Sequence, residues 1–219
     1  MFHRHCPMLR VGQWHRERRH SLHYPAMTKT KEKKHKGAKK SVKSKWAKVK
    51  RSGIHNKGLF ARKDIPGGTR IIEYVGEKLT TAESEQRGFD HDETARETGD
   101  GTVYMFILNK RYRIDGNVPW NPAKFANHSC APNAETDIIK GRIWLIALRD
   151  IEKGEEIVYD YNFDAEYYKD YPCLCGAKKC AGYIVGTEYR KKLRRKIRSE
   201  KKKAEVKKKR RRRRVKTGA

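Results

Sequence analysis

The most constraining feature of this sequence is the separation of its charged residues from its hydrophobic residues. The chain of 219 residues carries 54 Lys and Arg against 26 Asp and Glu, a net charge of +28. Residues 45–190 hold 23 of the basic and 22 of the acidic residues, a net charge of +1, so the two ends together carry +27. Long runs of like charge bury too little apolar surface to offset the entropy of folding. We therefore expect one near-neutral domain between a basic arm over residues 1–44 and a basic tail over residues 189–219.

The basic arm lacks both hydrophobic periodicity and the apolar stretch of a secretory signal, and no run in the chain approaches the ~18 apolar residues of a membrane span. We expect the arm to be disordered, and we expect an intracellular protein without membrane contact, located in the nucleus on chromatin or in a bacterial cytoplasm and nucleoid. His3, His5 and Cys6 begin a group of residues that could bind a metal, but the spacing of the group matches no closed site. An unstructured leader is the interpretation that we prefer.

Short runs of β-branched and aromatic residues, separated by Gly, Pro, Asn and Asp, recur from Trp46 onward. This pattern predicts a mainly β domain with short helices. The runs most typical of strands are residues 59–61, 70–75, 102–108, 112–114, 134–139, 142–147 and 156–159.

Two further segments have a polar, helix-like composition. Residues 80–97 predict a polar helical insert, and residues 83–100 contain seven acidic residues and two Arg, a net charge of −5 that suits a basic partner. After Thr187 the apolar residues Leu193, Ile197 and Val206 are too sparse for a helix that packs firmly. We expect a frayed basic helix or a tail there.

Three of the five cysteines, Cys173, Cys175 and Cys180, lie close together in a C-x-C-x4-C arrangement. Inside cells, thiols are more often free, catalytic or metal-bound than paired as disulfides. A closed tetrahedral zinc site needs four ligands, so three cysteines do not complete one. From spacing alone, both zinc ligands and free surface thiols remain open.

Several motifs follow one another in a distinctive order. They read SGIHNKGLFA at residues 52–61, EYVG at 73–76, YMF at 104–106, FANHSC at 125–130 and EEIVYDYNF at 155–163. Singly each is weak, since a Tyr-Asp-Tyr in a strand more often serves packing than catalysis. Together they make the chain, from about residue 42 to residue 186, resemble the SET-domain protein-lysine N-methyltransferases that carry a cysteine-rich post-SET zinc segment.

This resemblance implies a fold and a domain division. The SET-domain fold, a β-clip, consists of small sheets around a knot-like chain crossing. On this sequence the SET domain is expected over residues 45–165 and the post-SET zinc segment over residues 166–188. The resemblance adds Cys130 to the three later cysteines, and the implied zinc ligands are then Cys130, Cys173, Cys175 and Cys180.

The resemblance also implies a site for S-adenosylmethionine, closed by the zinc-bound segment. Asn56 stands where the family usually has glycine, and because Asn tolerates positive φ better than most residues, we expect the turn to survive. Asn127 and His128 could equally be structural ties of the chain crossing. The implied cofactor-binding residues are His55, Asn56, Lys57, Gly58, Tyr104, Asn127, His128 and Leu174.

Catalysis is assigned by the same resemblance to Tyr161, with Tyr159 and Tyr104 as further active-site residues. Methyl transfer needs a neutral lysine amine, and desolvation between aromatic walls beside a positive sulfonium lowers the amine pKa without a dedicated base. The family has Phe or Tyr at the position of Tyr159. A hydroxyl there leaves less room for a methylated amine, which predicts mono- or dimethylation. The alternative for Tyr159 is a plain core aromatic.

The function implied is methylation of lysine in a basic protein, such as a histone, a histone-like protein or a ribosomal protein, by a monomer. The tails are suited to bind DNA or RNA, because polybasic arms bind phosphate without sequence preference. The alternative is a non-catalytic nucleic-acid or chromatin-binding protein that acts through these tails. That alternative leaves no reason for Tyr161, Asn127, His128 and four cysteines to occur together.

Overall fold

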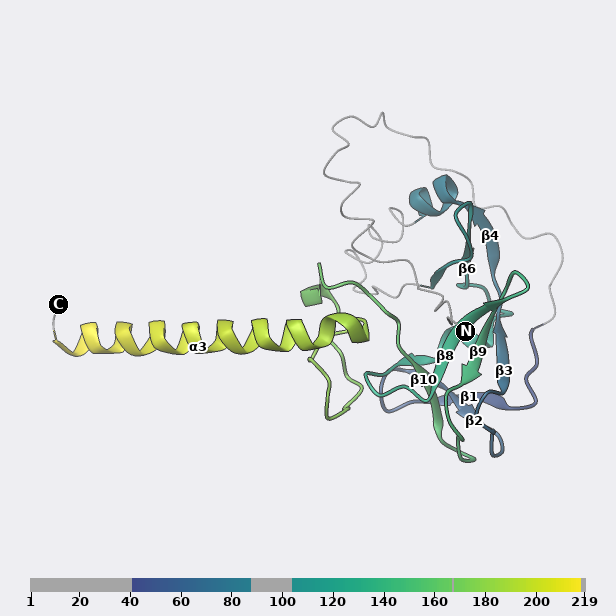
Figure 1. Cartoon of the computed structure of the whole chain (residues 1–219), viewed down its shortest axis with the longest axis horizontal. Helices are drawn as coiled ribbons and strands as arrows, with labels where there is room; N and C mark the ends of the chain where they lie inside the picture. Colours follow the sequence, from purple (N-terminus) through teal and green to yellow (C-terminus); the bar gives the residue numbers. More distant parts are fainter. Residues whose placement is uncertain (1–40, 88–103, 167, 218–219) are drawn as a thin grey trace.

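A larger β-sheet organises the chain, and a smaller sheet stands beside it (Figure 1). The computed structural model describes residues 41–87, 104–166 and 168–217, and side chains of the last helix only up to residue 209. The expected disorder of residues 1–40 and most of the acidic insert therefore lie outside the described residues.

The larger sheet has seven strands, six of them in the order β1-β2-β10-β8-β9-β3, while β7 pairs with β10 off this path. Their bounds are Ala47–Arg51 for β1, Lys57–Ala61 for β2, Arg70–Tyr74 for β3, Asn127–His128 for β7, Ala134–Ile139 for β8, Arg142–Ala147 for β9 and Glu156–Tyr159 for β10.

The smaller sheet has three strands in the order β4-β6-β5. Its strands are β4 (Glu77–Thr80), β5 (Met105–Ile107) and β6 (Tyr112–Asp115), and residues 81–87 form a helical segment directly after β4. The short 3-10 helices η1 (Pro122–Phe125) and η2 (Tyr168–Asp170) and the long helix α3 (Thr187–Thr217) complete the described chain.

Alternating burial explains why the central strands form. In β9 the side chains of Ile143, Leu145 and Ala147 are buried and their neighbours are not, which is the period of a strand with one face on the core. β8 and β9 are joined by Lys140 and Gly141, whose φ values of 49° and 74° are those of the tight hairpin turn that matches strand twist. Most of the core lies on this face of the larger sheet.

The predicted mainly β fold with short helices is confirmed. β8, β9 and β10 have the predicted bounds, and β2, β3 and β6 differ from the prediction by one or two residues. The prediction missed β1, β4 and β7. β1 is an exposed edge strand with a single buried residue, β4 is polar, and β7 has only two residues, so none carries a clear alternating pattern.

The expectation that the apolar residues after Thr187 are too sparse for a firmly packed helix is wrong for the first turns of α3. Leu193 is 3% exposed and packs with Tyr168 and Val185 in a second hydrophobic cluster. Sparse apolar residues suffice there because a buried Arg190 anchors the same turn by hydrogen bonds. Beyond these turns α3 projects away from the sheets (Figure 1). No helix within the described ranges is long and apolar enough to cross a membrane.

Candidate active site

Strand β10 brings together the two strongest sequence motifs. It runs parallel to β7, with Val158 opposite Asn127 and Tyr159 opposite His128. The amide of Ser129 donates a hydrogen bond to the Tyr159 carbonyl at 3.0 Å. Segments about thirty residues apart are thus fixed side by side, and β2 pairs with the other side of β10.

Asn127 ties this crossing to the turn before β2. Its side-chain nitrogen lies 2.7 Å from Glu156 Oε1, 3.0 Å from the Lys57 carbonyl and 3.1 Å from Ser52 Oγ. The side chain is buried, so these acceptors replace water. Ser52 Oγ also donates to the Glu156 carboxylate at 2.8 Å. The turn, β7 and β10 therefore form one hydrogen-bonded unit.

The turn at residues 55–58 is exposed at one end and tightly packed at the other. His55, Asn56 and Lys57 are exposed and Gly58 is buried. Asn56 has φ 32°, so the predicted positive φ at this position is confirmed. A Cβ on Gly58 would lie 2.3 Å from Glu156 Oε1, which leaves room only for glycine.

Aromatic rings form a row that follows β10. The ring centroids of Tyr159 and Tyr161 are 4.9 Å apart, and those of Tyr161 and Phe163 are 5.8 Å apart. The Tyr161 hydroxyl donates to the Ala126 carbonyl at 3.0 Å. Burial raises the pKa of the Tyr161 phenol above its ordinary value, and nearby Tyr104 raises it further. Tyr161 is therefore a neutral hydrogen-bond donor at physiological pH.

His128 connects this aromatic row to the cysteines. Its Nδ1 accepts a hydrogen bond from the Tyr161 amide at 3.1 Å, which places the ring proton on Nε2. Nε2 lies 3.5 Å from Cys130 Sγ. The imidazole is buried, and its ring centroid is 5.3 Å from that of Tyr161. His128 thus bridges the Tyr161 backbone and a cysteine sulfur.

Tyr104 lies in the segment before β5 and is held by its main chain. Its carbonyl accepts hydrogen bonds from the Tyr74 hydroxyl at 2.8 Å and from the Gly116 amide at 2.9 Å. The Lys124 ammonium stands 5.5 Å from the Tyr104 ring centroid. The chain directly before β5 therefore contributes a third tyrosine to the neighbourhood of Tyr161.

Four cysteine sulfurs gather beside His128. The Sγ atoms of Cys130, Cys173, Cys175 and Cys180 all lie within 4.8 Å of one another. Zinc–sulfur bonds of ~2.3 Å in a tetrahedron require sulfurs about 3.8 Å apart, so the set fits one zinc ion with small adjustment.

The electrostatics of this cluster favour a bound cation. The pKa of the Cys173 thiol is raised by its hydrogen bond with Cys130 and by burial, because adjacent thiolates repel one another. Only a positive ion lets all four sulfurs bind as thiolates. Backbone amides already support the cluster, since Cys130 N donates to Cys175 Sγ at 3.4 Å and Gly182 N to Cys180 Sγ at 3.2 Å.

Asn127, His128, Tyr159 and Tyr161 meet at β10, whereas His55, Asn56 and Lys57 are exposed. Leu174, expected against the cofactor, is 69% exposed and is not packed into the site by the rest of the described chain.

Sequence reasoning did not single out four residues that organise the site, namely Asn133, Glu156, Asp160 and Arg190. Asn133 is 1% exposed and holds β10 through hydrogen bonds of 2.9 Å from the Val158 amide and 2.8 Å to the Glu156 carbonyl. Glu156 and Asp160 lie within a motif that was recognised, and for Asp160 the available signal was its place between two tyrosines. Arg190 carried no such signal, because it stands in a run of basic residues.

Comparison with known proteins agrees with this geometry. Residues 56–162 match the sequence model of the SET domain. This stretch, just under half of the chain, is thus similar to a SET domain, and the cysteine cluster fits a post-SET zinc segment.

Its relatives include proteins named histone-lysine N-methyltransferase, H3 lysine-4 specific. Those from Aspergillus oryzae and Candida albicans are both 41% identical over 140 residues, which cover 61% of this chain and 11% and 13% of the relatives. The Saccharomyces cerevisiae protein is 40% identical over 140 residues, 61% of this chain and 13% of that protein. The chain thus spans only about an eighth of the length of these curated relatives.

Proposed function

We propose that this chain transfers a methyl group from S-adenosylmethionine to a lysine side chain of a histone. The observation that carries the proposal is the meeting of the aromatic row with the turn at residues 55–58 across β7 and β10. The names of its relatives support the class of reaction and the histone substrate. Nuclear chromatin is the location that this substrate implies.

The residues around the turn have the properties that the cofactor needs. When bound, S-adenosylmethionine supplies an activated methyl group on a positively charged sulfur. Exposed His55, Asn56 and Lys57 offer main-chain groups to its polar end, and Gly58 allows a close approach of the chain to Glu156. Asn127, His128, Tyr104 and Leu174 are assigned to the remaining contacts with the cofactor.

The aromatic row would prepare the lysine amine. Removing water from around an ammonium group lowers its pKa, and a neutral amine is the nucleophile. Tyr161, held by the Ala126 carbonyl at 3.0 Å, is the proposed catalytic tyrosine, and it aligns the reacting groups. Tyr159 is 2% exposed, and its hydroxyl would limit the space for a methylated amine. Mono- or dimethylation is the proposed outcome.

The zinc ion would be held by Cys130, Cys173, Cys175 and Cys180, and its role would be structural. Because Cys130 belongs to the chain after β7 and the other three to the segment after η2, the ion joins these two parts of the fold. We assign exposed Leu174 to the rim of the site, where a bound cofactor would cover it.

The test is methyl-labelled S-adenosylmethionine incubated with the purified full chain and histone H3, and in parallel with a bacterial histone-like protein and ribosomal proteins. An H3 peptide in which lysine 4 is replaced by arginine tests the lysine named by the relatives. We expect label on H3, loss of label in Tyr161→Phe, and retention in Tyr112→Phe, a control tyrosine of the smaller sheet. Cofactor binding with label on none of these proteins would contradict the proposed substrate, and absent cofactor binding would contradict the enzyme.

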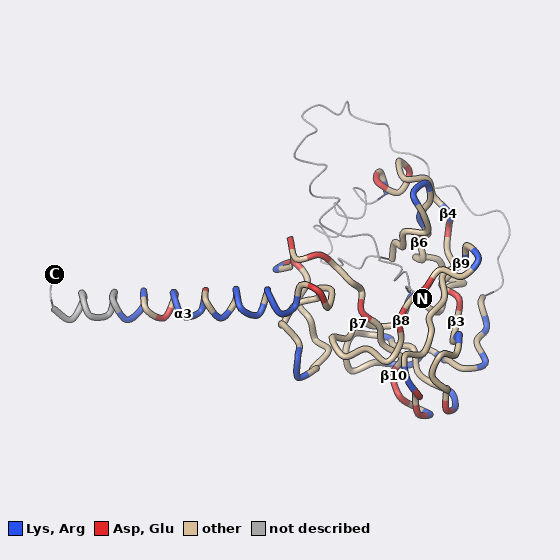
Figure 2. Tube along the Cα trace, in the orientation of Figure 1, with Lys and Arg blue, Asp and Glu red and all other residues tan. Residues whose placement is uncertain are grey.

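A second proposal concerns the basic end of the chain. Every described residue of α3 from Arg198 to Lys209 is exposed, and this stretch holds seven basic and two acidic residues (Figure 2). Such a surface suits the phosphates of a nucleic acid. Binding of DNA by α3 would accompany catalysis rather than replace it, because the site described above does not use this part of the helix.

A further inference from the structure

We propose that the first turns of α3 belong to the catalytic unit and that Arg190 is a positioning residue for Tyr161 and His128. The proposal rests on the proposed methyltransferase function. It assigns a role to a helix that follows the cysteine segment and contributes none of the candidate cofactor or zinc ligands.

Arg190 is buried and uses all three guanidinium nitrogens. Its Nε donates to the Val185 carbonyl at 3.0 Å, and its two terminal nitrogens donate to the Cys130 carbonyl and to Asp160 Oδ2, each at 2.6 Å. Only 6% of the residue is exposed. A planar guanidinium reaches three acceptors in fixed directions, so it links three segments of the chain.

Asp160 is the acceptor that connects Arg190 to the site, because it stands between Tyr159 and Tyr161. Its Oδ1 accepts a hydrogen bond from the Asn162 amide at 3.0 Å and lies 3.7 Å from His128 Nδ1. The carboxylate therefore holds the main chain directly after Tyr161 and lies close to the His128 ring.

Asp160 also holds the start of α3. Its Oδ2 accepts hydrogen bonds from the Thr187 amide at 3.1 Å and from Thr187 Oγ1 at 2.8 Å. Amides at a helix N-terminus are unpaired within the helix and carry partial positive charge, so a carboxylate is a suitable partner. The same oxygen thus binds the first residue of the helix and the arginine three residues later.

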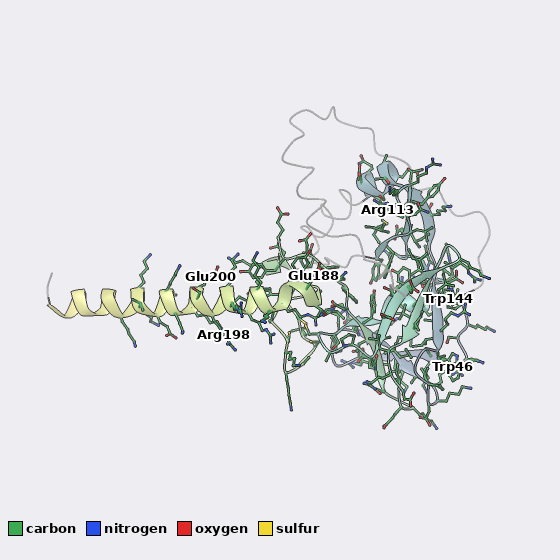
Figure 3. All side chains as sticks on the ribbon, viewed as in Figure 1. Trp46, Arg113, Trp144, Glu188, Arg198 and Glu200 are labelled. Carbon is green, nitrogen blue, oxygen red and sulfur yellow. The ribbon has the colours of Figure 1, made fainter. Side chains whose placement is uncertain are left out.

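Apolar contacts keep this turn in place. Leu193 and Ile197 follow Arg190 at spacings of three and seven residues, which puts all three on one face of the helix. Leu193 packs with buried Val185 and Tyr168, and Ile197 is partly buried against this cluster. Glu188 marks the docked end of α3, whereas the side chains of Arg198 and Glu200 radiate from the projecting part (Figure 3).

The consequence is a rigid chain of contacts from the helix to the reacting groups. Arg190 bonds the carbonyl of Cys130, whose sulfur lies 3.5 Å from His128 Nε2, while His128 Nδ1 accepts from the Tyr161 amide. Misplacing a catalytic group by about an ångström can cost about a hundredfold in rate. Loss of Arg190 should therefore lower kcat more than it changes KM.

The variants Arg190→Met, Arg190→Lys and Arg195→Met separate positioning from simple folding. Methionine keeps the length of the side chain without its donors, and lysine restores the charge but cannot serve three acceptors at once. Arg195 is exposed on the same helix and is the matched control. The concentration of cofactor-binding sites is measured by calorimetry, and kcat is calculated per site. Misfolded protein, which binds no cofactor, then does not lower the measured kcat.

On an H3 substrate we expect kcat to fall about tenfold to a hundredfold in Arg190→Met, with KM changed less than about threefold. Arg190→Lys should be intermediate and Arg195→Met unchanged. Truncation after Glu200, which keeps Arg190, Leu193 and Ile197, should leave kcat unchanged as well. An unchanged kcat per binding site in Arg190→Met would overturn the proposal, as would equal effects of the Arg190 and Arg195 variants.

A readout independent of activity is the imidazole nitrogen NMR signal of His128, assigned with His128→Asn. Arg190→Met should shift this signal and Arg195→Met should not. If the wild-type chain methylates no substrate, the proposed function has failed, and the histidine signal still decides whether Arg190 positions His128. An unmoved signal would overturn the positioning role in either case.

Discussion

The turn that precedes β2 has no room for a side chain at Gly58. A Cβ on Gly58 would lie 2.3 Å from Glu156 Oε1 and 2.9 Å from Ser52 Cβ. Glu156 cannot move freely, since Ser52 and Asn127 both bond its carboxylate. Gly58→Ala should therefore lower the free energy of unfolding by about 1–3 kcal/mol and weaken S-adenosylmethionine binding.

Thermal denaturation and calorimetric titration with the cofactor measure these two effects of Gly58→Ala. Gly53→Ala is the matched control, because no atom lies within 4 Å of a Cβ at that position. The explanation would be wrong if the two alanine variants lost stability and cofactor affinity equally.

The hydroxyl of Tyr159 should influence how many methyl groups the product lysine carries. The Tyr159 ring is buried between Tyr161 and Phe106, with centroids 4.9 Å and 6.2 Å away. Removing only its hydroxyl should enlarge the space beside the amine and shift products toward higher methylation. Mass spectrometry of an H3 peptide treated with Tyr159→Phe measures the distribution. An unchanged distribution would identify Tyr159 as a core aromatic without influence on the product.

Individual residues were predictable where their chemistry is distinctive. The positive φ of Asn56 and the meeting of four cysteines both agree with expectations from the sequence. Arg190 was not predictable, because it is one of many basic residues in its segment and only the fold distinguishes its buried guanidinium. Hydrogen bonds between residues thirty or more positions apart leave no mark in local patterns.

At the scale of elements, β10 is the centre of the molecule. It pairs with β2, β7 and β8, so strands from both ends of the domain meet on it. Its pattern of buried residues made the strand easy to predict. Of its two parallel partners, β8 was predicted as a strand, whereas β7 was not, because it has only two residues and is defined by the contact itself.

The cysteine segment is a second element whose order depends on its partners. It meets the domain at Cys130, and the isolated bridge between Pro172 and Tyr183 lies within the segment itself. With few buried apolar residues of its own, it should rely on zinc for much of its stability. Chelation, or Cys175→Ser, should release about one zinc per chain and abolish methylation, while far-UV circular dichroism retains the β-sheet signal.

Elemental analysis, the methylation assay and circular dichroism on one sample test this dependence. Cys6→Ser is the control, since Cys6 is the one cysteine of the sequence that is not a proposed zinc ligand. Full activity after verified zinc removal would contradict a structural role for the metal in the site.

The molecule as a whole divides into a domain of near-zero charge and a projecting basic helix. α3 has 31 residues, and at ~1.5 Å per residue it is about 46 Å long. Its sequence holds 19 basic and three acidic residues, a net charge of +16. Like charges one turn apart repel one another. A polyanion along the helix would relieve this repulsion, and duplex DNA has a major groove about as wide as one helix.

Truncation after Glu200 tests this division, because it removes 12 basic residues and one acidic residue and leaves the docked turns intact. The affinity for duplex DNA should fall, and so should the magnitude of the slope of log affinity against log salt, since fewer counterions are released. Fluorescence anisotropy across a salt series measures both, with single-stranded RNA of equal length in parallel.

The methylation rate on a free H3 peptide should not change, because the peptide offers no phosphates. Equal DNA affinity of the full chain and the truncated chain would assign the interaction to another part of the protein. A larger loss of affinity for RNA than for DNA on truncation would identify RNA as the partner of the helix.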